Sequence, residues 1–261
     1  MDGHRARKRF GQNFLVDQSY IHKIVDAVAP AHNDAVVEIG PGLGALTTPL
    51  LAALDHLHVV EIDRDLAQRL RERDDAAKLT IHEQDALTFD LTQLPNKLKV
   101  VGNLPYNISS PLLFHIAKSA SQVQHITVML QKEVVDRMTA APDTPDYGRL
   151  SVMLQATFAI KRLFIVPPGA FRPVPNVDSA VAQLTPLPTP LVPPEQFEVF
   201  SKIVMAAFGQ RRKTLHNTLK GMVADETLIA CGVDPRARGE TLSVHQYAAL
   251  TSALQLEMNQ R

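Results

Sequence analysis

The chain has 261 residues, 45% hydrophobic and 21% charged, with 27 Lys and Arg against 27 Asp and Glu. This composition excludes a disordered chain, and no run approaches the roughly 18 apolar residues of a membrane span. Cys231 is the only cysteine, which excludes an internal disulfide and a cysteine-based metal site. We therefore expect a cytoplasmic protein with no metal and no membrane partner.

Short apolar segments alternate with helical patterns through the first part of the chain. This order predicts an α/β fold: a Rossmann-like parallel sheet with helices on both faces. Two further strands and one further helix follow. Strands are predicted at 35–39, 58–62, 79–82, 99–101, 126–130, 161–166 and 179–184, and helices at 17–28, 45–54, 64–73, 111–119, 132–139 and 148–158.

Five prolines fall between Pro186 and Pro194. Proline fixes φ and removes a hydrogen-bond donor, so this segment is predicted to be a linker. The pattern after it is helical to the end of the chain. We therefore predict a catalytic domain with a basic N-terminal arm at 1–187, a linker at 188–194 and a small all-α domain at 195–261.

The segment VVEIGPGLGALT combines a strand, a glycine-rich turn and a helix, the order found in nucleotide-binding folds. Gly40 and Gly42 let the backbone approach a ligand. Glu61 ends the second strand, where a carboxylate can accept ribose hydroxyls, although a plain surface acid is the alternative. Asp85 ends the third strand and can accept from an adenine amine, although Asp also starts turns. Together these positions predict an adenosine site.

The segment GNLPYNISSP follows the fourth strand and either forms a simple turn or holds a flat, polar ligand. Asn103 offers a side-chain carbonyl oxygen. Pro105 favours an extended Leu104, whose carbonyl can then face the site. Tyr106 offers a stacking face, worth about 1–3 kcal/mol per base. This set suits a planar base that carries an amino group.

With E-x-G-x-G-x-G and N-L-P-Y at these places, the chain resembles S-adenosylmethionine-dependent amino methyltransferases. It is more specifically similar to the small-subunit (16S) rRNA adenine N6,N6-dimethyltransferase family (KsgA/RsmA type). Further matching stretches span nearly the whole chain: RKRFGQNFL (7–15), EIDRDLA (61–67), MLQKEVVDR (129–137), YGRLSV (147–152), VPPGAFRPVPNVDSAV (166–181) and FGQRRKTLHNTL (208–219).

The resemblance implies an enzyme that transfers methyl groups from S-adenosyl-L-methionine to N6 of two adjacent adenosines near the 3′ end of 16S rRNA. The product is N6,N6-dimethyladenosine, formed during ribosome biogenesis. Asn13 and Leu15 would contact the methionine end of the cofactor, the glycine-rich turn would admit it, Glu61 would hold its ribose and Asp85 its adenine amine.

The resemblance also implies how the target base is held. Asn103 would lie at the junction of the cofactor sulfonium and the target adenine, with the Leu104 carbonyl as a second acceptor. Tyr106 would stack on one face of the adenine, and Phe171 would approach the other. Without the resemblance, Phe171 is interpreted as a core aromatic residue.

Two basic clusters are candidates for contacts with 16S rRNA in the small ribosomal subunit. Such runs are usually solvated surface, but the resemblance favours phosphate contacts, made by a monomeric enzyme. The clusters are Arg5, Arg7, Lys8 and Arg9 near the N-terminus, and Arg211, Arg212 and Lys213 in the helical region.

Three alternatives remain open at this point. The first is a 23S rRNA adenine N6-methyltransferase of the antibiotic-resistance type. The second is a nicotinamide-dependent oxidoreductase, which would need a strict G-x-G-x-x-G and a His, Tyr or Lys acid. The third is a non-catalytic binding or assembly protein, against which the intact N-L-P-Y motif argues.

Overall fold

The computed structural model describes residues 13–95, 97–105, 108–210 and 212–259. The chain folds as two compact units, one made of residues up to 135 with 160–186, the other of 136–159 with 187–261. The boundary near 187 falls beside the predicted linker. Residues 136–159, however, belong with the C-terminal helices, which differs from the predicted catalytic domain of 1–187. No helix within the described ranges has the length and apolar character needed to cross a membrane.

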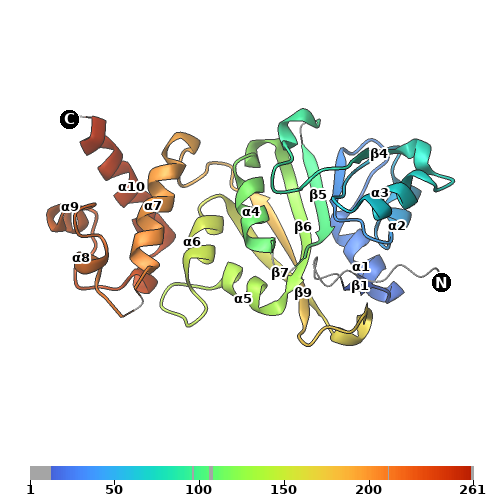
Figure 1. Ribbon diagram of the computed structural model, residues 1–261. Coiled ribbons are helices and arrows are strands. Elements are labelled where there is room, and N and C mark those ends of the chain that lie inside the picture. The colour runs from blue at the N-terminus through green and yellow to red at the C-terminus, as the bar shows by residue number, and fades with distance from the viewer. Residues whose placement is uncertain (1–12, 96, 106–107, 211, 260–261) are drawn as a thin grey trace. The chain divides into compact units, whose positions relative to one another are not determined.

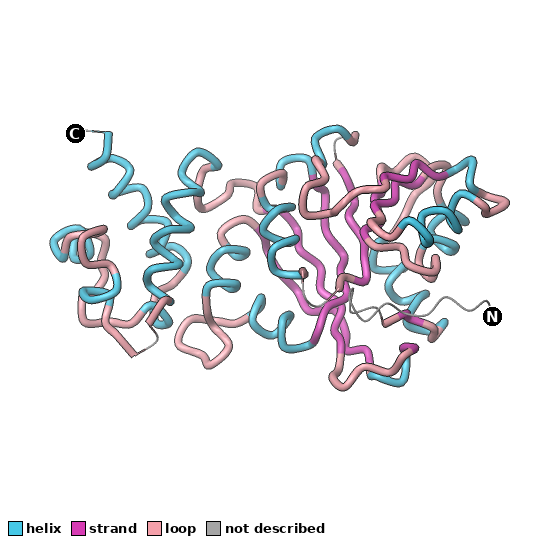
Figure 2. The backbone as a smooth tube through the Cα atoms, viewed as in Figure 1, coloured by secondary structure: helices cyan, strands magenta, loops and turns pink. Residues whose placement is uncertain are grey.

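The first unit is built on a seven-stranded sheet with strand order β4-β3-β2-β5-β6-β9-β7, flanked by helices (Figures 1 and 2). The predicted α/β class is confirmed. The strands are β2 (Val36–Ile39), β3 (Leu57–Val60), β4 (Leu79–His82), β5 (Leu98–Asn103), β6 (Val123–Gln131), β7 (Phe158–Val166) and β9 (Ser179–Pro186).

The sheet is mixed, because its last part does not continue the parallel order predicted for the alternating strands and helices. Strands β2 to β6 run parallel, but β9 pairs antiparallel with β6. Residues 167–178, between β7 and β9, hold only a short 3₁₀ turn and a two-residue strand. A connection without a crossover helix does not return the chain in parallel, so β9 runs back in the opposite direction.

The predicted helices are present, with ends shifted by a few residues. Asp17 caps the first helix by accepting from the Ser19 backbone N–H at 2.9 Å, and Asp63 caps the third. The helices are α1 (Gln18–Val28), α2 (Thr47–Ala53), α3 (Arg64–Arg71), α4 (Ser109–Ala117), α5 (Lys132–Thr139), α6 (Arg149–Gln155), α7 (Phe197–Phe208), α8 (Leu215–Thr218), α9 (Asp225–Ala230) and α10 (Val244–Asn259).

A small second sheet, not predicted from the sequence, pairs the first described strand with a late one. Strand β1 (Phe14–Leu15) lies antiparallel to β8 (Phe171–Arg172), with Leu15 opposite Phe171. Both side chains are buried in one apolar core with helix α1. The Val16 backbone N–H donates to the Ala170 carbonyl at 2.8 Å and continues the pairing by one residue.

Two buried tyrosines hold the second unit together. The Tyr147 hydroxyl donates to the Leu242 carbonyl at 2.8 Å, and the Tyr247 hydroxyl donates to the Gly239 carbonyl at 2.8 Å. A Cβ on Gly239 would lie 2.8 Å from the Ala207 carbonyl oxygen, so only glycine fits there. The Tyr147 contact is one of those that join residues 136–159 to the C-terminal helices.

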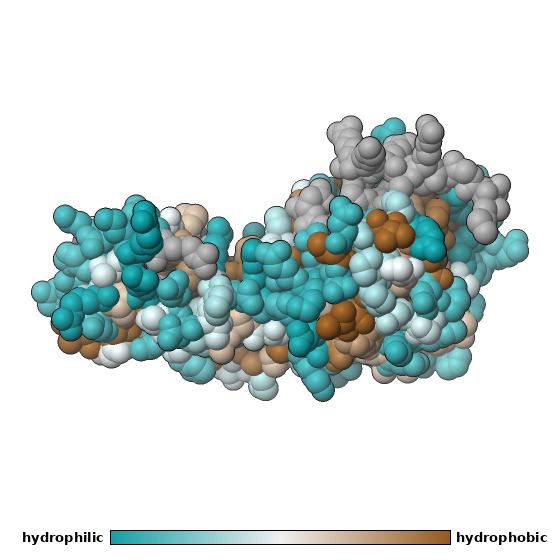
Figure 3. All heavy atoms as spheres, turned by 90° about the horizontal axis from the view of Figure 1, so that it is seen from below, coloured by the Kyte–Doolittle hydropathy of each residue, from teal (hydrophilic) through white to brown (hydrophobic). Residues whose placement is uncertain are grey.

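The surface seen in Figure 3 is largely hydrophilic, with separate apolar patches. Large exposed apolar side chains include Val16, Leu43 and Ile62 in the first unit and Met205, Ile229 and Leu256 in the second. Scattered exposed apolar residues are normal for a folded protein. Leu43 and Ile62 differ in that they also line the cavity described next.

Candidate active site

A cavity of about 320 Å³ opens in the first unit, where strands β2, β3, β4 and β5 end. Its size suits a small-molecule site, and its position is where ligands bind in open α/β sheets. The structure brings eight of the residues predicted from the sequence to its wall: Asn13, Leu15, Gly40, Gly42, Glu61, Asp85, Asn103 and Leu104.

The glycine-rich turn needs glycine for two separate reasons. Gly40 has φ +67° and Gly42 has φ +57°, both in the left-handed region that side chains disfavour. A Cβ on Gly42 would also lie 3.2 Å from the Phe14 ring. The turn therefore presents backbone without side chains at Gly40 and Gly42 to the cavity. The absence of a Cβ on Gly42 also leaves space for Phe14 of strand β1.

Glu61 lines the cavity just past the end of β3 and is 6% exposed. Its Oε1 accepts from the Asp63 backbone N–H at 2.9 Å, and its Oε2 accepts from the Gly42 N–H at 3.4 Å. Burial raises the pKa of this carboxyl group above its usual value, against these hydrogen bonds. Each oxygen keeps a second lone pair for a ligand hydroxyl.

Asp85 forms part of the cavity wall beyond β4, together with Gln84, Ala86 and Leu87. Its Oδ1 accepts from the Leu87 backbone N–H at 2.9 Å, which fixes the direction of the carboxylate. The turn interpretation and the binding interpretation of Asp85 are therefore compatible. The same side chain shapes the loop and lines the site.

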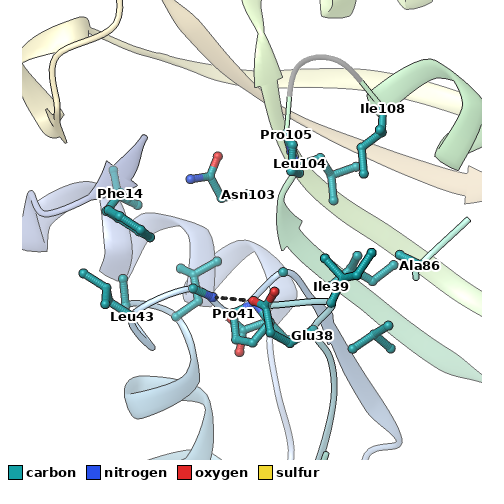
Figure 4. A pocket seen from close by; sticks show the side chains of 18 of the residues that line it. Phe14, Glu38, Ile39, Pro41, Leu43, Ala86, Asn103, Leu104, Pro105 and Ile108 are labelled. Atoms are coloured by element: carbon teal, nitrogen blue, oxygen red, sulfur yellow. Dashed lines mark hydrogen bonds between the residues drawn. The ribbon is translucent and has the colours of Figure 1, made fainter. Parts of the chain in front are cut away.

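Asn103 is the last residue of β5 and projects between Phe14 and Leu104 (Figure 4). Its Nδ2 donates to the backbone carbonyl of Asn13 at 3.0 Å. This contact assigns the nitrogen end of the amide and directs Oδ1 away from Asn13. Leu104 is buried, and its backbone N–H donates to the Met129 carbonyl at 3.1 Å.

Other predicted site residues lie elsewhere. Phe171 is fully buried in the core and is not among the residues that line the cavity, so its contact with a target base stays a prediction. Arg212 and Lys213 are exposed beyond helix α7. Tyr106, Arg5, Arg7, Lys8, Arg9 and Arg211 fall outside the described residues.

Glu38 is a cavity residue to which the sequence analysis gave no role of its own, although it is the first residue of the E-x-G-x-G-x-G motif. It lies on β2, is 2% exposed, and its Oε2 accepts from the Thr47 hydroxyl at 2.6 Å. Burial, and to a smaller extent the nearby Glu61 carboxylate, raise the pKa of Glu38 to about 7. One acidic residue inside the apolar run Val36–Ile39 could have pointed to this role. Acidic side chains are rarely buried without a partner, and buried ones are often found at functional sites.

These features fit an adenosine-type ligand with positive charge. The bare glycine turn, the Glu61 carboxylate and Asp85 provide acceptors for hydroxyl and amino groups, and two buried acids favour a cation. Within the described ranges, no group of three or more His, Cys, Asp or Glu is placed to hold a metal ion.

The comparison with protein families decides the class of this site. Residues 3–256 match the family model of the ribosomal RNA adenine dimethylases. The chain belongs to this family. The predicted family, enzyme class and methyltransferase fold are therefore confirmed, and the nicotinamide-dependent alternative is set aside.

Curated relatives match over nearly their full length. The chain is 58% identical to a ribosomal RNA small subunit methyltransferase A of Aromatoleum aromaticum, over 97% of this chain and 95% of that protein. It is 55% identical to the protein of the same name in Nitrosospira multiformis, over 95% and 96%.

Two solved structures are also similar. The 23S rRNA methyltransferase ErmE has a TM-score of 0.69 and 27% identity, over 93% of this chain and 100% of that chain. A dimethyladenosine transferase from Plasmodium falciparum has a TM-score of 0.77 and 23% identity, over 95% and 98%, and shares the fold.

Replacing Glu38 by Gln should change the pH dependence of stability. The folded pKa of about 7 exceeds the ordinary value of 4.5, so the stability contributed by the protonated carboxyl is present below pH 4.5 and is lost as the pH rises through 7. Glu38→Gln should therefore be more stable than the native chain at pH 8, by up to ~3 kcal/mol, and equally stable at pH 4.5. Urea unfolding followed by circular dichroism at both pH values measures this. A difference independent of pH would contradict it.

Proposed function

We propose that this protein transfers methyl groups from S-adenosyl-L-methionine to N6 of two adjacent adenosines near the 3′ end of 16S rRNA. The observation that carries this proposal is the pairing of an adenosine-type cavity with Asn103 and Leu104 at its edge. The substrate follows from relatives that carry the small-subunit name, one of which is 58% identical to this chain.

The cofactor contacts follow from the cavity wall. Asn13 and Leu15 would face the methionine end, Glu61 the ribose and Asp85 the adenine amine. Bound S-adenosylmethionine supplies a methyl group that its sulfonium already activates. No metal is needed for this chemistry, so we propose none.

Asn103 and Leu104 would act on the acceptor, because the exocyclic N6 of adenine is conjugated with the ring and weakly nucleophilic. The Asn103 Oδ1 and the Leu104 carbonyl accept from the two N6–H groups and hold the nitrogen lone pair toward the methyl group. As the N–C bond forms, the bond from the methyl group to the sulfonium sulfur would break, and N6 would then release one proton to water. The same acceptors stabilise positive charge that develops on N6. Alignment alone can lower the barrier by several kcal/mol.

The target base must leave its stack to reach the cavity. Tyr106 is proposed to stack on it, with Phe171 toward its other face. Phosphate contacts are proposed for the two basic clusters, in an enzyme that works as a monomer in the cytoplasm on the small subunit or its precursor. Folded RNA is recognised largely through shape, which is compatible with a balanced overall charge.

The proposed reaction is tested by labelled methyl transfer. Small subunits that lack the modification, and large-subunit RNA as the comparison, are incubated with the protein and labelled S-adenosylmethionine. Nuclease digestion should release labelled N6,N6-dimethyladenosine from the small subunits alone. Labelling of the large-subunit RNA instead would support the 23S alternative, and no labelled adenosine would reject both.

Asn103→Ala should lower the rate of methyl transfer about 100-fold, the usual cost of losing one group that stabilises charge in the transition state. The affinity for S-adenosylmethionine, measured by calorimetry, should change by less than about threefold, because other residues hold the cofactor. Near-normal turnover in this variant would remove Asn103 from the mechanism.

Replacing Arg211, Arg212 and Lys213 together by Ala should weaken RNA binding. Each lost phosphate contact should reduce the slope of log K against log salt by about 1. Filter binding of small-subunit RNA at several salt concentrations measures the slope. A matched triple replacement of Arg64, Arg69 and Arg71 on helix α3 should leave it unchanged. An unchanged slope in the 211–213 variant would show that this cluster is ordinary solvated surface.

A further inference from the structure

The orientation of the Asn103 amide is set by a residue 90 positions away in the sequence. The Asn103 Nδ2 donates to the Asn13 backbone carbonyl at 3.0 Å. An amide is nearly symmetric in shape, so without such a contact its two orientations fit the same space. The flipped orientation would present an NH2 group to the N6 amino group of a target base, placing two donors face to face.

The Asn13 carbonyl is itself held by the short sheet that the sequence did not predict. Phe14 and Leu15 pair with Arg172 and Phe171 in β8. The Val16 and Asp17 backbone N–H groups both donate to the Ala170 carbonyl, at 2.8 and 3.3 Å. The Ala170 carbonyl therefore fixes the end of strand β1 that leads into helix α1.

Phe171 and Leu15 anchor this sheet in the apolar core. They are directly opposite each other, and they are 0% and 4% exposed. A buried aromatic side chain of this size contributes several kcal/mol to packing. The β1–β8 pair is thus fixed to the body of the first unit rather than lying loosely over the cavity.

We infer that strand β1 is a positioning element for the target base. The Asn13 carbonyl accepts a hydrogen bond from the side-chain amide of Asn103 and thereby directs Oδ1 into the cavity. The inference rests on the proposed function, in which Oδ1 accepts from N6. Asn13 acts here through Asn103 and through its main chain. This role is separate from the contact with the methionine end of the cofactor expected for the same residue.

Val16→Pro tests this arrangement, with Val16→Ala as the matched control. The side chain of Val16 is 44% exposed, so both variants spare the core. Proline removes the N–H that donates to Ala170 and still favours an extended Leu15, whereas alanine keeps the N–H. At saturating S-adenosylmethionine, kcat should fall about tenfold in Val16→Pro, as expected for the loss of one hydrogen bond. The KM for small subunits should change by less than about twofold, and Val16→Ala should match the native chain.

A second readout does not depend on catalysis. In protein labelled with ¹⁵N-asparagine, the Asn103 side-chain amide is assigned by its disappearance in Asn103→Ala. Its hydrogen exchange should be slow in the native chain and at least tenfold faster in Val16→Pro. The Asn217 side chain, which donates to the Thr214 hydroxyl at 2.9 Å in the second unit, serves as the internal control and should not change.

The outcomes separate the inference from the proposed function. Unchanged kcat in Val16→Pro, or reduced kcat with unchanged exchange at Asn103, overturns the inference. Absence of methyl transfer by the native chain rejects the proposed function, while the exchange experiment still decides whether β1 holds the amide. If Val16→Pro fails to fold, Asn103→Asp replaces it, because aspartate keeps an acceptor and loses the donor. Native kcat in Asn103→Asp overturns the inference, and a loss comparable to that of Asn103→Ala supports it.

Discussion

The close approach of strand β5 to the end of β2 is the constraint on which the cavity depends. A Cβ on Gly102 would lie 2.6 Å from the Ile39 carbonyl oxygen and 2.9 Å from the Leu104 Cδ2. The carbonyl belongs to the sheet backbone and cannot move aside, so only glycine lets β5 run past the end of β2 here. Asn103, which ends β5 and is still paired with Met129 of β6, consequently lies in the wall of the same cavity as the Gly40 turn.

Electrostatics complements this geometry. Glu38 and Glu61 are both nearly inaccessible to solvent, and the Glu61 carboxylate contributes to the raised pKa of Glu38. Burial disfavours the ionised form, and a nearby cation favours it. This part of the cavity wall therefore matches a ligand with positive charge. Arg73, which is paired with Asp75, lowers the pKa of Glu38 and so offsets only part of the cost of burial.

The core of this site could be predicted because buried parallel strands appear as short, continuous apolar runs, and the residue after each run marks the functional edge of the sheet. Gly40, Glu61, Asp85 and Asn103 were found in this way. Strands of two residues carry no periodicity, so β1 and β8 were missed. The reversal of β9 had a signal, since no helix separates it from β7. The partnership of 136–159 with the C-terminal helices rests on contacts between residues far apart in the sequence, such as the Tyr147 hydrogen bond to Leu242 and the Asp143 N–H bond to the Glu240 carbonyl, which no local pattern encodes.

The tie between Asn103 and Asn13 also bears on the second methylation. Under the proposed mechanism, N6 uses two N–H groups in the first transfer and has one left for the second. An amide whose nitrogen end is bound cannot turn to follow this change. The base must adjust instead, by rotating about its C6–N6 bond so that the remaining N–H meets one of two fixed acceptors. Fixed acceptors therefore allow both transfers only if the space between Phe14 and Leu104 also admits the first methyl group.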